Sequence, residues 1–143
     1  MLLPEKTAII YGGGGSIGGA VARAFAREAA RVYLAGRTQA KLDRVAEEIR
    51  SGGGAAETAQ LDALDPEAVD RHADAVAAEA GGIDISFNLI THGDVQGTPM
   101  AEMDVEDYVR PVETAVRTTF ITARAAARMV RKVVVTAVTT GRV

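Results

Sequence analysis

The sequence contains no cysteine and only two histidines, His72 and His92. The missing thiols exclude a disulfide framework and a thiolate metal site. Two histidines without carboxylate help, and without an HExxH-type spacing, do not make a histidine metal site. No apolar run approaches the roughly 18 residues of a membrane-spanning helix. We therefore expect no metal centre and no membrane partner.

An excess of charge of one sign is also missing. The formal net charge is −3, which gives no reason to expect nucleic acid or an anionic membrane surface as a partner. The first 13 residues carry Glu5 before their apolar stretch and no small-residue cleavage site after it. That pattern is not typical of a signal peptide, so we expect a cytoplasmic protein. The 143 residues, 48% of them hydrophobic and 24% charged, suit one soluble globular domain.

Apolar runs alternate with helical patterns along the chain. Strands are expected at residues 7–11, 31–35, 55–61, 83–90 and 132–138, and helices at about 17–30, 39–50, 65–80 and 104–131. Thr38, the sequence Asp65-Pro66-Glu67 and Asp104 mark helix starts. Strands that alternate with helices imply crossover connections and a parallel sheet. The sequence therefore predicts an α/β fold over residues 1–143, a single domain with a doubly wound parallel sheet in the order 3-2-1-4-5.

The ten residues YGGGGSIGGA, from Tyr11 to Ala20, contain six glycines and lead directly into a helical pattern. Missing side chains let the backbone approach a pyrophosphate, and the N-terminus of the following helix offers free N–H donors and positive potential. Ser16 adds a hydroxyl donor. The alternative is a flexible glycine-rich turn without a ligand. The position after the first strand and before an amphipathic helix favours phosphate binding.

This stretch resembles the T-G-x-x-x-G-x-G motif that opens the short-chain dehydrogenase/reductase family. Gly12 and Gly18 match its first and last glycines, whereas Tyr11 replaces the threonine and Ser16 the middle glycine. A serine at that place is similar to the divergent enoyl-reductase branch of the family. The resemblance implies a Rossmann-like, NAD(P)-binding fold. It also implies that the pyrophosphate lies against Gly12, Gly14, Ser16, Ile17 and Gly18.

The end of the second expected strand reads AGRTQAKL, residues 35–42. An NAD site usually has an acidic residue here, whereas a nearby arginine accommodates the 2′-phosphate of NADP. Gly36 stands where the resemblance places the acid, and Arg37 follows it. A guanidinium can bind a phosphate bidentately, and Lys41 can assist. The resemblance thus implies NADP in preference to NAD. The alternative is that Arg37 is only a solvated charge at the end of a strand.

Two further residues extend the resemblance. Asp62 follows the third expected strand, where the family places an aspartate that meets the adenine amino group. As an alternative, its carboxylate caps a turn or a helix, because Asp65 lies three residues further on. Asn88 matches the first asparagine of the family's N-N-A-G segment, followed here by Leu89 and Ile90. A buried asparagine needs hydrogen-bond partners in either case, so Asn88 either has a structural role or contacts the cofactor.

The sequence does not contain the pair of residues that carries the family's chemistry. The family transfers a hydride between nicotinamide C4 and a carbonyl or alcohol carbon, with a tyrosine as general acid/base and a lysine four residues later. Gly15, Arg37 and Val112 follow the three tyrosines at that distance. Ala115 or a neighbour stands where the family's supporting asparagine is expected. The sequence therefore assigns no catalytic residue.

The family's catalytic serine would follow the fifth strand, where this sequence has threonines at positions 136, 139 and 140. A threonine could replace the serine, but ordinary β-propensity explains these residues equally well. His92 could act as a general base in the loop over the expected site, or it is an ordinary loop histidine. Because the resemblance stops near the fifth strand, we expect the chain to be incomplete at its C-terminus.

Two hypotheses about function follow. In the first, the chain is the cofactor-binding portion of an NADP-dependent oxidoreductase that reduces a carbonyl or oxidises an alcohol of a small-molecule substrate. In the second, it is a non-catalytic dinucleotide-binding or assembly module without the Tyr-x-x-x-Lys pair. The long helix near the C-terminus corresponds to the one that packs against another subunit in the family, so we expect a homo-oligomer.

Overall fold

The computed structural model describes residues 1–129. Its sheet is parallel, with four strands in the order β3-β2-β1-β4. The strands are β1 (Thr7–Tyr11), β2 (Arg31–Gly36), β3 (Ala55–Gln60) and β4 (Ile85–Asn88). The helices are α1 (Ser16–Arg27), α2 (Gln39–Ser51), α3 (Pro66–Ala80) and α4 (Val105–Ala127), with a short 3-10 helix η1 (Met100–Glu102) before α4. The predicted α/β fold is confirmed, and the predicted fifth strand at 132–138 lies outside the described residues.

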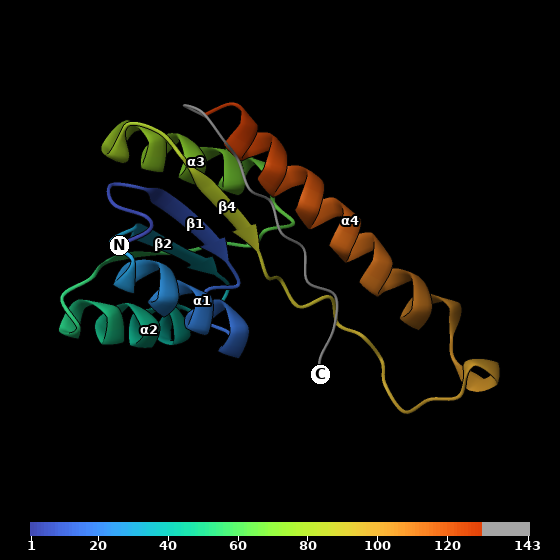
Figure 1. Ribbon diagram of the computed structural model, residues 1–143. Coiled ribbons are helices and arrows are strands. Elements are labelled where there is room, and N and C mark those ends of the chain that lie inside the picture. Colours follow the sequence, from blue (N-terminus) through green and yellow to red (C-terminus); the bar gives the residue numbers. More distant parts are fainter. Residues whose placement is uncertain (130–143) are drawn as a thin grey trace.

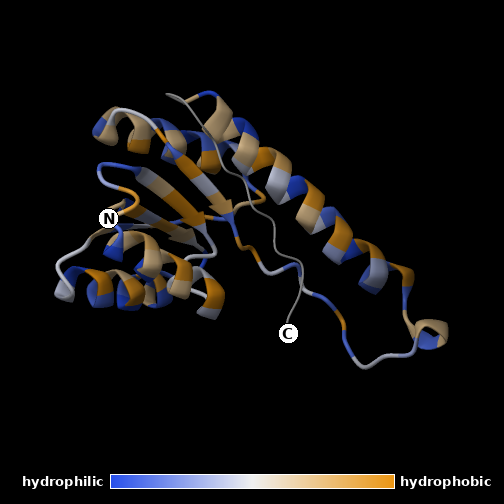
Figure 2. Cartoon of the chain, viewed as in Figure 1, coloured by the Kyte–Doolittle hydropathy of each residue, from blue (hydrophilic) through white to orange (hydrophobic). Residues whose placement is uncertain are grey.

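Two helices cover each face of the sheet (Figure 1). Side chains of β1 alternate between the faces, because successive residues of a strand point in opposite directions. Ala8 and Ile10 pack with residues of α1 and α2, whereas Ile9 and Tyr11 pack with residues of α3 and α4. Every residue of β1 is buried, which explains its continuous apolar run. Figure 2 shows the hydrophobic colouring on the strands between the helix layers.

Polar contacts hold α4 on α3. Nη2 of Arg124 lies 3.3 Å from Oδ2 of Asp70, and Nη1 of Arg128 lies 3.2 Å from the same oxygen. These ion pairs are partly exposed, so each adds little by itself, but the shared carboxylate makes them a small network. Within residues 1–129, none of the helices combines the length and the apolar character that crossing a membrane requires.

The structure corrects the predicted ends of two elements. Helix α1 ends at Arg27 and not near Ala30, because Ala29 takes a left-handed conformation with φ of 69°. Strand β4 covers Ile85–Asn88 and not residues 83–90. It pairs with residues 8–11 of β1, and β1 ends where Gly12 turns the chain with φ of 79°. The Leu89 N–H still donates to the Tyr11 carbonyl at 2.9 Å, but the residues after Leu89 have no strand beside them to continue the ladder.

The predicted helix starts differ in how they are capped. Oδ1 of Asp65 accepts a hydrogen bond from the Ala68 N–H at 3.0 Å, so this aspartate caps α3 as predicted. The side chains of Thr38 and Asp104 make no capping hydrogen bond. At both helices the backbone carbonyl of the N-cap residue accepts a hydrogen bond from the first turn instead. The Thr38 carbonyl accepts from the Lys41 N–H at 3.1 Å, and the Asp104 carbonyl accepts from the Asp107 N–H at 3.0 Å.

Ala29 stands where helix ends usually have glycine. Its N–H donates to the Ala26 carbonyl at 3.0 Å, and the Ala30 N–H donates to the Phe25 carbonyl at 3.1 Å, which is the Schellman pattern. A left-handed conformation costs a residue with a Cβ roughly 1 kcal/mol. We expect Ala29→Gly to raise the free energy of unfolding by about 1 kcal/mol in urea denaturation. Ala20→Gly, at an exposed position inside the same helix, should lower it by about the same amount. A loss of stability in Ala29→Gly would refute the assignment.

Candidate functional site

A cavity of about 560 Å³ lies at the edge of the sheet where the parallel strands end. The glycine loop, residues 12–15, connects β1 to α1 and forms one wall together with the start of α1. The segment after β4 forms the other wall. The described residues that line the cavity are Gly12, Gly15, Ser16, Ile17, Gly18, Leu89, Ile90, Thr91, His92, Gly93, Asp94 and Gln96. Ligands of open α/β sheets bind outside this edge, near the point where the strand order reverses.

The glycines of the loop are needed for close contacts inside the protein. A Cβ added to Gly12 would overlap the carbonyl of Leu89, and a Cβ added to Gly18 would overlap the carbonyl of Gly12. At Gly14 the added atom would lie 2.8 Å from Cβ of Lys41. The loop is further closed by the Gly15 N–H, which donates to the Gly12 carbonyl at 3.0 Å. The missing side chains thus let strand, loop and helices pack together, in addition to any approach by a ligand.

The N-terminus of α1 presents free donors at this edge. Gly15 occupies the N-cap position, no side chain caps the helix, and its first turn holds no acidic residue. The first intrahelical bond joins the Gly19 N–H to the Gly15 carbonyl at 2.8 Å. The N–H groups of Ser16, Ile17 and Gly18 therefore have no acceptor within the helix. Such donors, at the positive end of a helix dipole, suit the diphosphate of a dinucleotide.

Two cations lie on the other side of the glycine loop. Arg37 directly follows β2 and is exposed, with its carbonyl accepting a hydrogen bond from Nε2 of Gln60 at 2.9 Å. Lys41 lies on α2 next to Gly14. Within residues 1–129, neither side chain has a carboxylate partner. Gly36, the buried last residue of β2 directly before Arg37, carries no acidic side chain at this position. The local charge therefore favours an anion.

The family model for short chain dehydrogenases matches residues 6–143. The chain belongs to the short-chain dehydrogenase family. It is 42% identical over 88 residues to an uncharacterized oxidoreductase of Mycobacterium tuberculosis (strain CDC 1551 / Oshkosh), an alignment that covers 62% of this chain and 34% of that protein. This confirms the predicted family and, with the parallel sheet, the predicted Rossmann-like fold.

Solved structures of short-chain dehydrogenases superpose on the chain. A short-chain type dehydrogenase/reductase from Mycobacterium marinum shares 36% identity and a TM-score of 0.77, over 89% of this chain and 51% of the other. A metagenomic short-chain oxidoreductase, solved in complex with NADP, shares 29% identity and a TM-score of 0.79, over 90% of this chain and 57% of the other. The chain thus spans about half the length of these solved short-chain dehydrogenases and about a third of the mycobacterial oxidoreductase.

Asp62 and Asn88, the two other residues assigned by the family resemblance, have structural contacts. Oδ1 of Asp62 accepts a hydrogen bond from the Leu64 N–H at 2.9 Å, as expected from the turn-capping alternative. Asn88 is buried; its Nδ2 donates to Oγ1 of Thr118 at 3.0 Å, and its Oδ1 accepts from the Ile90 N–H at 3.1 Å. Asn88 therefore ties β4 to α4 and shapes the segment that forms the cavity wall. Contact of either residue with a cofactor stays a prediction.

None of the three tyrosines lines the cavity. Tyr11 is buried in the core between the sheet, α3 and α4. Burial, reinforced by the Asp70 carboxylate, raises the pKa of its phenol far above the ordinary value. Burial also raises the pKa of Tyr33, and Tyr108 lies exposed on α4. The phenols of Tyr11 and Tyr33 are therefore neither placed nor tuned to exchange a proton at neutral pH, and Tyr108 lies away from the cavity.

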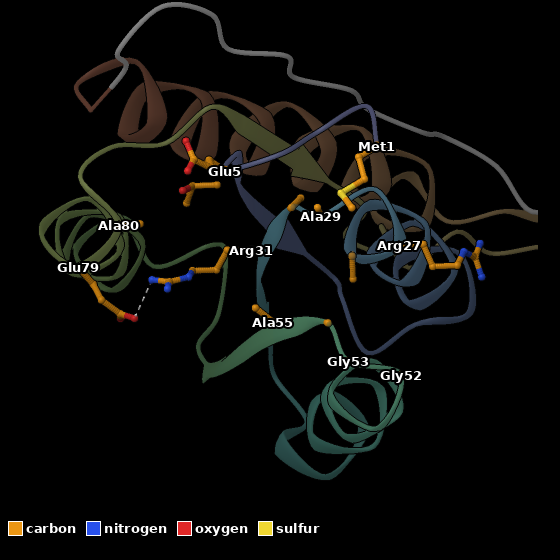
Figure 3. Close-up of a pocket in the computed structure, with 14 residues that line it drawn as sticks. Met1, Glu5, Arg27, Ala29, Arg31, Gly52, Gly53, Ala55, Glu79 and Ala80 are labelled. Atoms are coloured by element: carbon orange, nitrogen blue, oxygen red, sulfur yellow. Dashed lines mark ion pairs between the residues drawn. The ribbon is translucent and has the colours of Figure 1, made fainter.

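A larger hollow of about 860 Å³ lies at the opposite edge of the sheet (Figure 3). It is lined by the starts of β1, β2 and β3 and by the C-terminal ends of α1 and α2. Arg31 reaches into it and pairs with Glu79, with 3.5 Å between Nη1 and Oε1. Helix C-termini repel anions, and ligands of open α/β sheets bind at the other edge. Size alone therefore does not make this hollow the cofactor site.

Proposed function

We propose that this chain is the cofactor-binding domain of an NADP-dependent oxidoreductase that reduces a carbonyl or oxidises an alcohol of a small molecule. The observation that carries the proposal is the uncapped N-terminus of α1, which meets a tightly closed glycine loop at the carboxyl edge of the sheet. NADP, when bound, supplies or accepts a hydride at nicotinamide C4. The chain's own residues bind and orient it.

Each part of NADP has a proposed binding group at the carboxyl edge of the sheet. The backbone N–H groups at the start of α1 would bind the diphosphate, Arg37 the 2′-phosphate, and Asp62 the adenine amino group. Asn88 would support the wall of the site through its bonds to Thr118 and Ile90. The residues proposed to surround the diphosphate are Gly12, Gly14, Ser16, Ile17 and Gly18.

The preference for NADP over NAD rests on charge. An acidic residue after β2 would accept the ribose hydroxyls of NAD and repel a 2′-phosphate. Here Gly36 is followed by Arg37, whose guanidinium has no carboxylate partner among residues 1–129. A charge-assisted hydrogen bond to a phosphate is about twice as strong as a neutral one. The NADP complex of the metagenomic relative supports the same choice.

Isothermal titration of the purified chain with NADPH and with NADH tests this proposal. We expect NADPH to bind at least about tenfold more tightly, because one extra pair of charge-assisted hydrogen bonds contributes roughly 1.5–3 kcal/mol. Equal affinity for the two would contradict the choice of NADP. Failure of both to bind would refute the dinucleotide site itself.

The same proposal includes assembly of the protein in the cytoplasm as a homo-oligomer. One side of α4 packs on the sheet through Thr118, Ile121 and Ala125. The other side exposes an apolar stripe, spaced three or four residues apart, that a second copy could cover. The stripe consists of Val105, Val109, Val112, Val116 and Phe120. Light scattering after size exclusion should then give a mass of at least two chains.

A further inference from the structure

One buried imidazole lies in the wall of the cavity, on the segment that follows β4. His92 is 8% exposed and lines the cavity together with Gly12 and Ser16 from the opposite wall. Within residues 1–129, its side chain makes no hydrogen bond or ion pair. The ring nitrogens of His92 are not among the fully buried atoms without a partner in the described residues, so they are accessible from the cavity that the residue lines, and a ligand there can reach them.

The position of His92 along the sheet shows which part of the ligand it would meet. Arg37 follows β2, the glycine loop follows β1, and His92 comes four residues after β4. The order β2-β1-β4 places these three features in a row along one edge of the sheet. A dinucleotide has the same linear order, which is the 2′-phosphoadenosine, the diphosphate and the nicotinamide riboside. If the first two parts lie at Arg37 and α1, the third extends toward His92.

We infer that His92 is a cofactor-contacting residue that binds the nicotinamide riboside half of NADP by hydrogen bonds. This inference rests on the proposed function. A neutral imidazole has one N–H donor and one acceptor nitrogen, which match the ribose hydroxyls and the carboxamide, since both of these groups donate and accept. Asp94 is the other ionisable residue that lines the cavity among those described, and it is exposed. His92 is therefore the buried residue that can select this half.

The second histidine also has a ring nitrogen, Nε2, without a hydrogen-bond partner among the described residues, but it lies away from the cavity. His72 lies on α3, and its ring packs edge-on against Tyr33 with 6.5 Å between the ring centroids. It does not line the cavity, and burial lowers its pKa. The imidazole signals of His72 therefore serve as an internal reference in spectra of the wild-type protein.

Two ligands separate the contribution of His92 from the proposed function. NADPH contains both halves of the cofactor, whereas adenosine 2′,5′-bisphosphate contains only the half next to Arg37. We expect His92→Leu to weaken NADPH about tenfold, because a hydrogen bond of ordinary strength is lost, and to change the affinity for adenosine 2′,5′-bisphosphate less than twofold. His92→Gln, which keeps an N–H donor, should recover most of the loss. Thr91→Ala, at an exposed position of the same wall, is the control and should change neither affinity.

The outcomes that overturn the inference are distinct from those that overturn the proposed function. Equal losses for both ligands in His92→Leu, or no loss for NADPH, would show that His92 does not contact the nicotinamide riboside. If wild-type protein binds neither ligand, the dinucleotide site itself is wrong. If the His92→Leu variant does not fold, the imidazole NMR signals of the wild-type chain test the inference instead. NADPH should shift the His92 signals and adenosine 2′,5′-bisphosphate should not, and the reverse would refute the inference.

Discussion

Replacing Gly18 with alanine should lower the free energy of unfolding by about 2–3 kcal/mol, the range for an overpacked site. The new Cβ would overlap the Gly12 carbonyl oxygen and lie 3.1 Å from Cα of Gly13. These are backbone atoms, and Gly12 is held to β2 by its N–H, which donates to the Ala35 carbonyl at 2.8 Å. Helix propensity alone predicts the opposite sign, a gain of about 1 kcal/mol for alanine.

The contact should outweigh the propensity because the loop cannot move without losing its bonds to β2. Urea denaturation gives the free energy directly, and the melting temperature should fall by roughly 5–10 °C. Gly52→Ala is the matched control. Its φ of −83° suits alanine, and its added Cβ would lie 3.5 Å from the nearest atom, the Ile49 carbonyl oxygen. That variant should be unchanged or up to about 1 kcal/mol more stable. A Gly18→Ala protein as stable as the Gly52→Ala protein would refute the contact.

Arg37→Glu should weaken NADPH binding by about 100-fold and NADH binding by less than about threefold. The substitution removes the charge-assisted hydrogen bonds to the 2′-phosphate, which contribute roughly 1.5–3 kcal/mol, and adds repulsion. NADH lacks that phosphate, so it loses only the weak long-range attraction, which salt screens. Titrations of both nucleotides at 0.15 M salt, a condition of about 8 Å screening length, would measure the two losses.

Arg71→Glu is the control for the change in net charge. Arg71 is exposed on α3, which covers the other face of the sheet from α2 and Lys41. The Arg71→Glu substitution should change the affinities for NADPH and NADH by less than about twofold, because salt screens the new charge. Equal losses for NADPH and NADH in Arg37→Glu would mean that Arg37 acts on the diphosphate or on the fold, and not on the 2′-phosphate.

The elements that the sequence predicted well are those whose signals are local. The apolar run of β1 and the Asp65-Pro66 start of α3 both depend on neighbouring residues, and both lie where predicted. The ends of α1 and β4 depend on something else. Ala29 takes a left-handed conformation that a glycine at this position would have indicated in the sequence. The length of β4 depends on its partner strand β1. Neither cause is visible in a window of sequence.

The sequence predicted what kind of site this is, a phosphate-binding loop, but not the contacts that require its residues. The glycine pattern indicated a phosphate-binding loop, yet Gly12 is needed because Leu89 lies against it, 77 positions away in the chain. Asp62 was expected either to cap a turn or to contact adenine. Its bond to the Leu64 N–H fits the first role, and contact with adenine stays a prediction. His92 was expected in the loop over the site, as a general base or as an ordinary loop residue. Its burial in the cavity wall could not be predicted, because it results from the path of the segment after β4.

The most direct test of the dinucleotide site is an NMR titration of the ¹⁵N-labelled chain with NADPH. The amide signals of Gly14, Ser16, Ile17 and Gly18 should show the largest shifts, because their N–H groups would bind the diphosphate. The side-chain Nε signal of Arg37 should shift with NADPH and not with NADH. If the largest shifts instead fall on residues 26–31 and 52–55, around the hollow of Figure 3, the cofactor binds at the opposite edge of the sheet and the proposed site is wrong.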